Sequence, residues 1–314
     1  MSVKLKIIFM GTPEFATESL KLLVLKKYNI VGVVTSPDKP SGRGQKITSS
    51  SVKLFAETQN LNILQPENLR DSDFIRNLKK LNADIFIVVA FRILPEKVWK
   101  IPKYGTINLH ASLLPNYRGA APINWVIING EKETGVSTFK IEKNIDTGNI
   151  IYQEKIKISP DEIAGNLHDK LMLTGSKLLC KTIDAITHGK APNIPQNNKF
   201  KSYAPKIYKR DCKIDWNKNV ENIHNKIRGL SPYPTAWTLI DKSKIKNIKL
   251  FKSSVEKVKH NKRCGTVIVN NKNLKIAAKN GYIKIHELQL SGKKRMKTED
   301  FLRGFSFSKN QVLH

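Results

Sequence analysis

Two side chains able to handle charge and protons stand two positions apart in the segment INLHASLLPNYRGAAPIN, residues 107–124. Residues i and i+2 of a strand project to the same face, so Asn108 and His110 are expected to lie side by side. An amide can donate to a developing oxyanion, and an imidazole can transfer a proton. Arg118 adds a guanidinium to the same segment. A lone Asn or His at a strand end is more often structural, so it is the combination that favours a catalytic site.

A carboxylate that could complete this site is Asp146, in the segment NIDTGNIIY. Asp-Thr-Gly between two strands is by itself only a turn signal. The turn follows the next strand along the chain, however, and could bring Asp146 back to His110. A carboxylate on one imidazole nitrogen fixes the tautomer and stabilises the imidazolium. Since no nucleophilic Ser or Cys stands out, the trio would suit direct acyl transfer from a donor to an acceptor.

The elements that must position these residues alternate between strand and helix patterns over the first 190 residues. Strands are predicted at 6–11, 29–36, 61–65, 83–90, 104–110, 134–142 and 150–158. Helices are predicted at 13–27, 51–60, 71–82, 120–129 and 161–189, with Asp71 as a cap and Gly175 as a candidate interruption. This order predicts an α/β fold with a doubly wound, mostly parallel, Rossmann-like sheet. Ligands in such sheets bind outside the carboxyl ends of the strands, where Asn108 and His110 are expected.

The pattern changes after the proline-containing segment KAPNIPQNNKFKSYAPK, which reads as a linker. Beyond it, short predicted strands separated by turn signals favour a small, OB-like β-barrel. The expected domains are therefore a catalytic domain at 1–189, a linker at 190–205 and a β-barrel domain at 206–314.

The formal net charge of +29 is unevenly distributed. Residues 1–200 contain 28 Lys and Arg against 18 Asp and Glu, whereas residues 201–314 contain 27 against 8. Two thirds of the excess charge therefore lies in about one third of the chain, which favours a nucleic-acid-binding module. A lysine-rich composition that arose by drift is the alternative explanation.

Other features exclude several classes of protein. The apolar run at the N-terminus is too short for a signal peptide, and no stretch is long enough for a membrane span. The three cysteines are far apart and have no His at ligand spacing, so we expect a cytoplasmic protein without disulfides or a metal site. Neither a dinucleotide fingerprint nor a Walker A motif is present.

Several motifs together carry a resemblance to a known family. The segment NLHASLLPNYRGAAPI, followed by Asp-Thr-Gly, closely resembles the signature of folate-dependent formyltransferases. The segments IIFMGTPEFA, SPDKPSGRGQK and RGAAPINW, and the basic region that begins near KIDW, resemble the members of that family that formylate methionyl-initiator-tRNA. The resemblance runs from about residue 5 to 304.

This resemblance implies transfer of a formyl group from 10-formyltetrahydrofolate to the α-amine of methionyl-initiator-tRNA, by a monomeric enzyme that needs no metal and no membrane. It implies a role in the initiation of protein synthesis. Asn108, His110 and Asp146 match the catalytic trio, and the C-terminal domain matches one that contacts tRNA. The remaining implied site residues are Ser112, Leu113, Leu114 and Pro115 for folate, and Lys39, Arg43 and Lys46 for the tRNA acceptor end.

One segment departs from the family pattern. In VAFRILPEKV, Arg92 stands where many members have a longer, Gly-containing segment beside the expected folate pocket. Three other functions remain open: formyl transfer to a nucleotide-linked amino sugar, formyl transfer to glycinamide ribonucleotide, and non-catalytic RNA binding. The basic loop and C-terminal region argue against the first two, and the intact trio argues against the third.

Overall fold

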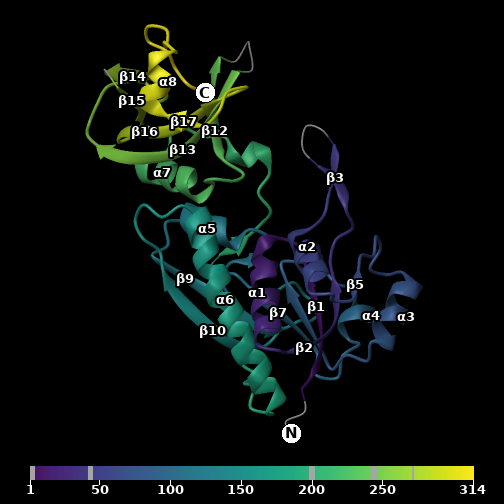
Figure 1. The fold of residues 1–314 in the computed structure, drawn as a ribbon. Helices are drawn as coiled ribbons and strands as arrows, with labels where there is room; N and C mark the ends of the chain where they lie inside the picture. Colours follow the sequence, from purple (N-terminus) through teal and green to yellow (C-terminus); the bar gives the residue numbers. More distant parts are fainter. Residues whose placement is uncertain (1–3, 42–44, 198–201, 242–245, 271) are drawn as a thin grey trace. The chain divides into compact units, whose positions relative to one another are not determined.

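The computed structural model describes residues 4–41, 45–197, 202–241, 246–270 and 272–314 (Figure 1). The chain packs into two compact units. The first unit consists of residues 1–119, 135–156 and 168–203, and the second consists of 120–134, 157–167 and 204–314. The segments 120–134 and 157–167 therefore pack with the C-terminal region, although they lie within the expected catalytic domain in sequence. The division at 189 and 206 stays a prediction.

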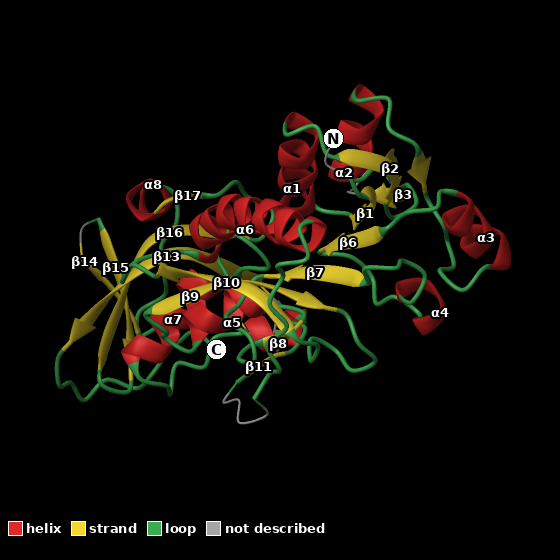
Figure 2. Cartoon of the chain, turned by 90° about the horizontal axis from the view of Figure 1, so that it is seen from below, coloured by secondary structure: helices red, strands yellow, loops and turns green. Residues whose placement is uncertain are grey.

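A seven-stranded sheet forms the centre of the first unit. Its strands, in spatial order, are β10 (Ile150–Lys157), β9 (Glu133–Lys140), β7 (Thr106–His110), β6 (Ile85–Val89), β1 (Lys6–Gly11), β2 (Asn29–Val34) and β5 (Ile63–Leu64). The strands from β7 to β5 are parallel, and β9 pairs antiparallel with β7. Figure 2 shows β6 and β7 lying beside each other. The expected mostly parallel α/β fold is confirmed.

Helices cover both faces of this sheet. They are α1 (Glu14–Leu25), α2 (Ser51–Thr58), α3 (Ser72–Lys80), α4 (Glu96–Trp99) and α6 (Ala164–Thr187). Phe74 and Leu78 of α3 pack in one cluster with Ile8 and Met10 of β1. On the opposite face, α6 approaches Leu109 of β7. The predicted cap is confirmed, because the Asp71 carboxylate accepts from the backbone N–H groups of residues 73 and 74.

Two local expectations were wrong. The helix α6 is continuous, so Gly175 does not interrupt it. A Cβ at that position would lie 2.9 Å from Leu109 Cδ2, so the glycine allows the helix to pack closely on β7. The segment 37–50, whose Pro, Gly and Ser content predicts a loop, contains two short paired strands, β3 (Lys39–Ser41) and β4 (Lys46–Thr48). The pairing rests on backbone hydrogen bonds, for which the Pro- and Gly-rich sequence gives little signal.

The second unit is built on an antiparallel sheet. Its strands, in spatial order, are β12 (Ala236–Asp241), β13 (Lys246–Lys257), β16 (Gly281–Leu290), β15 (Asn273–Ala278) and β14 (Val267–Asn270), with β17 (Met296–Lys297) beside β16. The last residues of the chain join the two outer strands. Leu239 of β12 exchanges backbone hydrogen bonds with His314 over 2.8 and 2.9 Å, and the Val267 N–H of β14 donates to the Gln311 carbonyl over 2.8 Å, so the sheet closes into a small β-barrel. The expected separate C-terminal β region is confirmed.

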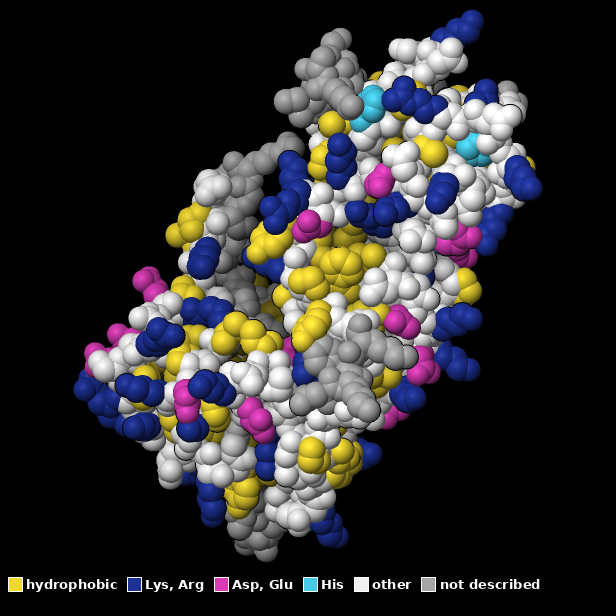
Figure 3. Space-filling model, turned by 180° about the vertical axis from the view of Figure 1, so that it is seen from behind, with side chains coloured by type: hydrophobic (Ala, Val, Ile, Leu, Met, Phe, Trp, Pro, Cys, Tyr) yellow, Lys and Arg dark blue, Asp and Glu magenta, His cyan; other side chains and the backbone are white. Residues whose placement is uncertain are grey.

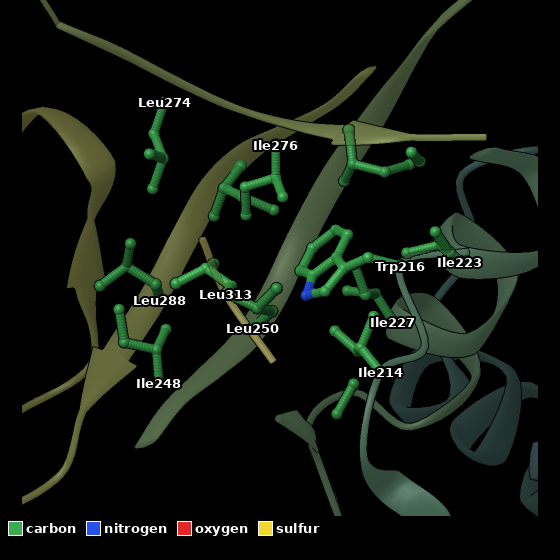
Figure 4. Close-up of a cluster of buried hydrophobic side chains, with 14 of the residues drawn as sticks. Ile214, Trp216, Ile223, Ile227, Ile248, Leu250, Leu274, Ile276, Leu288 and Leu313 are labelled. Carbon is green, nitrogen blue, oxygen red and sulfur yellow. The ribbon is translucent and has the colours of Figure 1, made fainter. Parts of the chain in front are cut away.

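A single apolar core supports this sheet. It includes Trp216, whose indole donates to Thr238 Oγ1 over 3.0 Å, and Ile223 and Ile227 of α7 (Val220–Gly229) (Figure 4). Leu250 of β13 and Ile276 of β15 project into the same cluster. Buried apolar side chains from a helix and several strands form one core, which is what an independently packed domain requires. The other elements of the chain are α5 (Pro122–Ile128), α8 (Thr298–Arg303), the 3-10 turn at Lys209–Cys212, and the short strands β8 (Arg118–Gly119) and β11 (Tyr203–Ala204).

Candidate active site

Strand β7 places Asn108 and His110 on the same face, near its carboxyl end, as the sequence predicts. Asn108 lies between Val88 of β6 and Phe139 of β9 in the strand register. Its side-chain amide has no hydrogen-bond partner among the described residues, and it is only partly buried. An amide in this position is available to a ligand at the carboxyl end of the sheet.

The imidazole of His110 is buried, with 7% of the residue exposed. Its Nε2 lies 2.9 Å from the carbonyl oxygen of Tyr117. Because a carbonyl oxygen only accepts, Nε2 carries the proton in this hydrogen bond. Its Nδ1 lies 3.8 Å from Oδ2 of Asp146, so the structure brings His110 and Asp146 together at a separation longer than a hydrogen bond. A ring protonated on both nitrogens has an oxygen acceptor facing each of them.

The loop that carries Asp146 is held by several hydrogen bonds. Its Oδ2 accepts from the backbone N–H of Gly119 over 2.9 Å. Gln196 donates to the carbonyl oxygens of Asp146 and Gly148, over 2.9 and 2.8 Å. A Cβ at Gly148 would lie 1.7 Å from the Lys140 carbonyl oxygen, which explains the glycine of the Asp-Thr-Gly turn. The Gly119 N–H therefore holds the carboxylate itself, and Gln196 holds the backbone of the loop that carries it.

The loop after β7 is fixed mainly through its backbone. Ser112 Oγ donates to the Asn116 carbonyl over 2.7 Å, and Ser137 Oγ of β9 donates to the Ser112 carbonyl over 2.6 Å. The N–H of Leu114 donates to Ser137 Oγ over 3.1 Å, and Gln153 of β10 donates to the Leu114 carbonyl over 2.9 Å. These contacts define a rigid turn at the carboxyl end of β7.

The side chains of this turn differ in exposure. Leu114 is buried with Phe139 and Ile150, whereas Leu113 and Pro115 are partly exposed. Ser112 is fully buried. Leu113 and Pro115, together with backbone atoms, are therefore better placed to meet a ligand than the buried side chain of Leu114.

Sequence reasoning missed the residues that position the trio. Arg118 was grouped with the catalytic side chains, but it is buried and donates to Gln196 Oε1 from Nε and Nη2, over 3.1 and 2.6 Å. Gln196 and Gln153 lie far in sequence from the residues that they contact. No motif marks them, and only the folded chain shows their role.

The predicted tRNA loop is described only in part. Lys39 lies exposed on β3 and Lys46 lies on β4, whereas Arg43 lies outside the described residues. Its predicted role stays a prediction.

Arg92, where the sequence departs from the family pattern, makes local contacts. Its guanidinium donates to the carbonyl oxygens of Pro66 and Glu67, over 2.7 and 2.9 Å. Burial lowers the pKa of this guanidinium. The side chain thus ties the segment after β6 to the segment after β5, both at the carboxyl end of the sheet.

The described part of the chain offers two further findings. No group of three or more His, Cys, Asp or Glu side chains there is arranged to hold a metal ion. No helix in those residues combines the length and the apolar character needed to cross a membrane.

Comparison with known proteins decides the family. The formyl transferase profile matches residues 4–183, and the profile of the formyl transferase C-terminal domain matches residues 206–306. The chain belongs to the formyl transferase family.

The chain is similar in sequence to several named formyl transferases. The chain is 52% identical to a methionyl-tRNA formyltransferase of Flavobacterium johnsoniae, with 97% of this chain and 98% of the relative covered. It is 49% identical to a methionyl-tRNA formyltransferase of Bacteroides fragilis, with 96% of this chain and 95% of the relative covered.

Two solved structures share the fold. The sugar 3N-formyl transferase WlaRD superposes with a TM-score of 0.66 at 24% identity, covering 93% of this chain and all of WlaRD. HypX of Aquifex aeolicus superposes with a TM-score of 0.65 at 14% identity, covering 96% of this chain and 47% of HypX. At these identities the likeness shows the fold alone.

Proposed function

We propose that this chain transfers the formyl group of 10-formyltetrahydrofolate to the α-amine of methionyl-initiator-tRNA, for the initiation of protein synthesis. The observation that carries the proposal is the placement of Asn108, His110 and Asp146 together at the carboxyl end of the parallel sheet. Relatives about 50% identical over nearly the whole chain are named methionyl-tRNA formyltransferase, which supports this acceptor.

The proposed reaction is a direct acyl transfer through a tetrahedral intermediate. The amine nitrogen bonds to the formyl carbon, the bond from that carbon to the folate nitrogen breaks, and the amine proton passes to that nitrogen. A free α-amine titrates at about 7.7–8.0, and esterification of the neighbouring carboxylate lowers that value, so much of the amine is neutral near pH 7. The reaction therefore depends more on positioning and charge stabilisation than on a strong base.

Each member of the trio has a distinct role in this proposal. The Asn108 amide donates to the oxyanion of the intermediate, and a protonated His110, whose two N–H groups face Tyr117 and Asp146, stabilises it through its positive charge. Asp146, held by the Gly119 N–H, orients the imidazole and stabilises its positive charge.

The two substrates have separate binding regions in this proposal. The turn at 112–115 contacts the folate, with the partly exposed side chains of Leu113 and Pro115 facing the ligand. WlaRD was solved in the presence of 5-N-formyl-THF and HypX in complex with tetrahydrofolic acid, which supports a folate. Lys39, Arg43 and Lys46 contact the acceptor end of the tRNA, and the basic region 206–314 contacts its phosphates. The enzyme acts as a monomer in the cytoplasm.

The test is a formyl-transfer assay with 10-formyltetrahydrofolate and three acceptors. We expect rapid formylation of methionyl-tRNA, and none of uncharged tRNA or of a nucleotide-linked amino sugar. Preferential formylation of the amino sugar would overturn the proposal in favour of sugar modification.

A second assay separates the two binding regions. Arg43→Ala should weaken methionyl-tRNA binding and leave folate binding unchanged, whereas Leu113→Ala should do the reverse. Arg76→Ala, on the exposed side of α3, is the matched control for Arg43→Ala and should change neither. Equal losses for both ligands in Arg43→Ala would contradict the assignment of this loop.

A further inference from the structure

The edge of the parallel sheet opposite the trio is strongly basic, and the proposed reaction does not use it. We name it the amino edge: it is formed by the starts of β1, β2, β6 and β7, the turns that lead into them, the end of α3 and the helix α4. Parallel strands begin at one edge and end at the other, so this edge lies a full strand length from Asn108 and His110. For a five-residue strand that distance is about 16 Å.

The turns before β1 and β2 contribute four exposed lysines, which are Lys4, Lys6, Lys26 and Lys27. Lys4 Nζ donates to the Lys27 carbonyl over 3.1 Å, so the two turns lie next to each other. Lys4, Lys26 and Lys27, together with His188 at the end of α6, line a hollow of about 400 Å³.

The segments that lead into β6 and β7 contribute five more exposed lysines: Lys79 and Lys80 at the end of α3, Lys97 in α4, and Lys100 and Lys103 after it. Three of them, Lys79, Lys97 and Lys100, line a second hollow of about 450 Å³. Beside these lysines, the half-exposed ring of Tyr104 lies 5.5 Å from Lys103 Nζ.

Nearby carboxylates leave most of this charge unbalanced. Asp84 accepts from the Lys6 backbone N–H, Asp184 accepts from the Tyr28 hydroxyl, and Glu96 pairs with Lys100. In the part of the chain that the structure describes, none of the other eight lysines forms an ion pair. A lysine-rich composition that arose by drift would scatter lysines over the surface. Figure 3 shows one face of the molecule, on which Lys and Arg side chains (dark blue) are scattered in this way. The amino edge instead has lysines in every one of these four connections.

We propose that the amino edge is a second RNA-binding surface, which contacts the phosphates of an RNA segment remote from the reacting amine. Lysines at the rims of two hollows suit a curved phosphate backbone, and an exposed tyrosine beside them can stack on an unpaired base. A membrane-binding surface would need several exposed apolar side chains. Among the described residues of this edge, Leu25 is the large aliphatic side chain that is exposed.

The experiment uses the full chain and a 12-nucleotide oligouridylate as the probe. The edge variant combines Lys26→Gln, Lys27→Gln, Lys79→Gln and Lys80→Gln. The matched control combines Lys157→Gln, Lys170→Gln, Lys177→Gln and Lys181→Gln, which removes the same charge from exposed positions outside the amino edge. Calorimetric titration across a salt series gives the number of bound RNA molecules, their affinity and the salt slope. Vesicles containing phosphatidylserine serve as a parallel probe.

We expect the wild-type chain and the control to bind one more oligonucleotide than the edge variant. The edge variant should bind the oligouridylate about tenfold more weakly than the wild-type chain. The slope of its log affinity against log salt concentration should be shallower by about 2–3. Equal losses in both variants would mean diffuse charge and would overturn the proposal. Loss of vesicle binding without loss of RNA binding would overturn it in favour of a membrane surface. Formylation of methionyl-tRNA should stay within about twofold in both variants, so a failure here is distinguishable from a failure of the proposed function.

Discussion

The backbone N–H of Gly119 donates to the carboxylate of Asp146 over 2.9 Å and joins two loops that are distant in sequence. The same carboxylate oxygen lies 3.8 Å from Nδ1 of His110. The end of β7 therefore supplies the imidazole, and β8, directly after the turn that follows β7, supplies the donor that holds the carboxylate near it. Activity should depend on this arrangement as a unit.

Removing a member of the trio should reduce turnover without unfolding the chain. Asn108→Ala should lower the rate of formyl transfer on the order of 10²–10³-fold, because an oxyanion donor is lost. His110→Ala should cost about 10²–10⁴-fold, and Asp146→Ala should be comparably severe. Single-turnover formylation measures the rates, and circular dichroism checks the fold. A rate for His110→Ala within about threefold of wild type would show that the assignment is wrong.

Gln196 should act as a positioning residue for Asp146. Gln196→Ala removes the donors to the Asp146 and Gly148 carbonyls and one acceptor of Arg118, so the loop should lose its fixed geometry. We expect about a tenfold loss in kcat with a smaller change in KM for methionyl-tRNA. Gln196→Glu keeps the acceptor for Arg118 and loses the donor, and it should be as impaired as the alanine variant. Wild-type kcat in both variants would contradict this role.

The glycine of the Asp-Thr-Gly turn should tolerate no side chain. Gly148→Ala places a Cβ against the Lys140 carbonyl, so the backbone must move, at a cost of about 1–3 kcal/mol in the free energy of unfolding. Formyl transfer should fall as well, because Asp146 moves with the turn. Gly304→Ala is the control, since a Cβ there meets nothing within 4 Å and the effect on stability should be small. Denaturant titration of both variants tests the difference, and equal effects would rule out the steric explanation.

The second unit should lose stability in mild acid. Burial, with the nearby Arg228 guanidinium, lowers the pKa of His224, whose Nδ1 lies 2.9 Å from Ser253 Oγ. Because the folded pKa is below the unfolded value of about 6.5, this contribution is present above pH 6.5 and is lost as the pH falls through the folded value. His224→Gln should flatten the decline in stability between about pH 7 and pH 5. Thermal unfolding at several pH values measures it, with His188→Gln as the control at an exposed histidine of the first unit. An unchanged pH dependence in His224→Gln would exclude this histidine as the cause.

The sequence by itself determined the elements and the chemistry of the trio. Apolar periodicity located the strands of the parallel sheet, because a buried strand must be apolar along its length. The two-residue spacing of Asn108 and His110 put them on one face of β7, since the alternation of a strand is a local property of the backbone. Asp71 could be predicted as a cap because capping depends only on neighbouring residues.

The tertiary structure alone decided what holds this chemistry in place. Gln196 reaches the Asp146 loop across 50 residues of sequence, and Gln153 reaches Leu114 across 39. Arg118 was grouped with the catalytic side chains in sequence, yet folding buries it against Gln196. Residues 120–134 pack with the C-terminal region although their sequence continues the α/β pattern. Local patterns record which face of an element is apolar, but which polar groups meet depends on how distant segments pack, and that is settled only when the chain has folded.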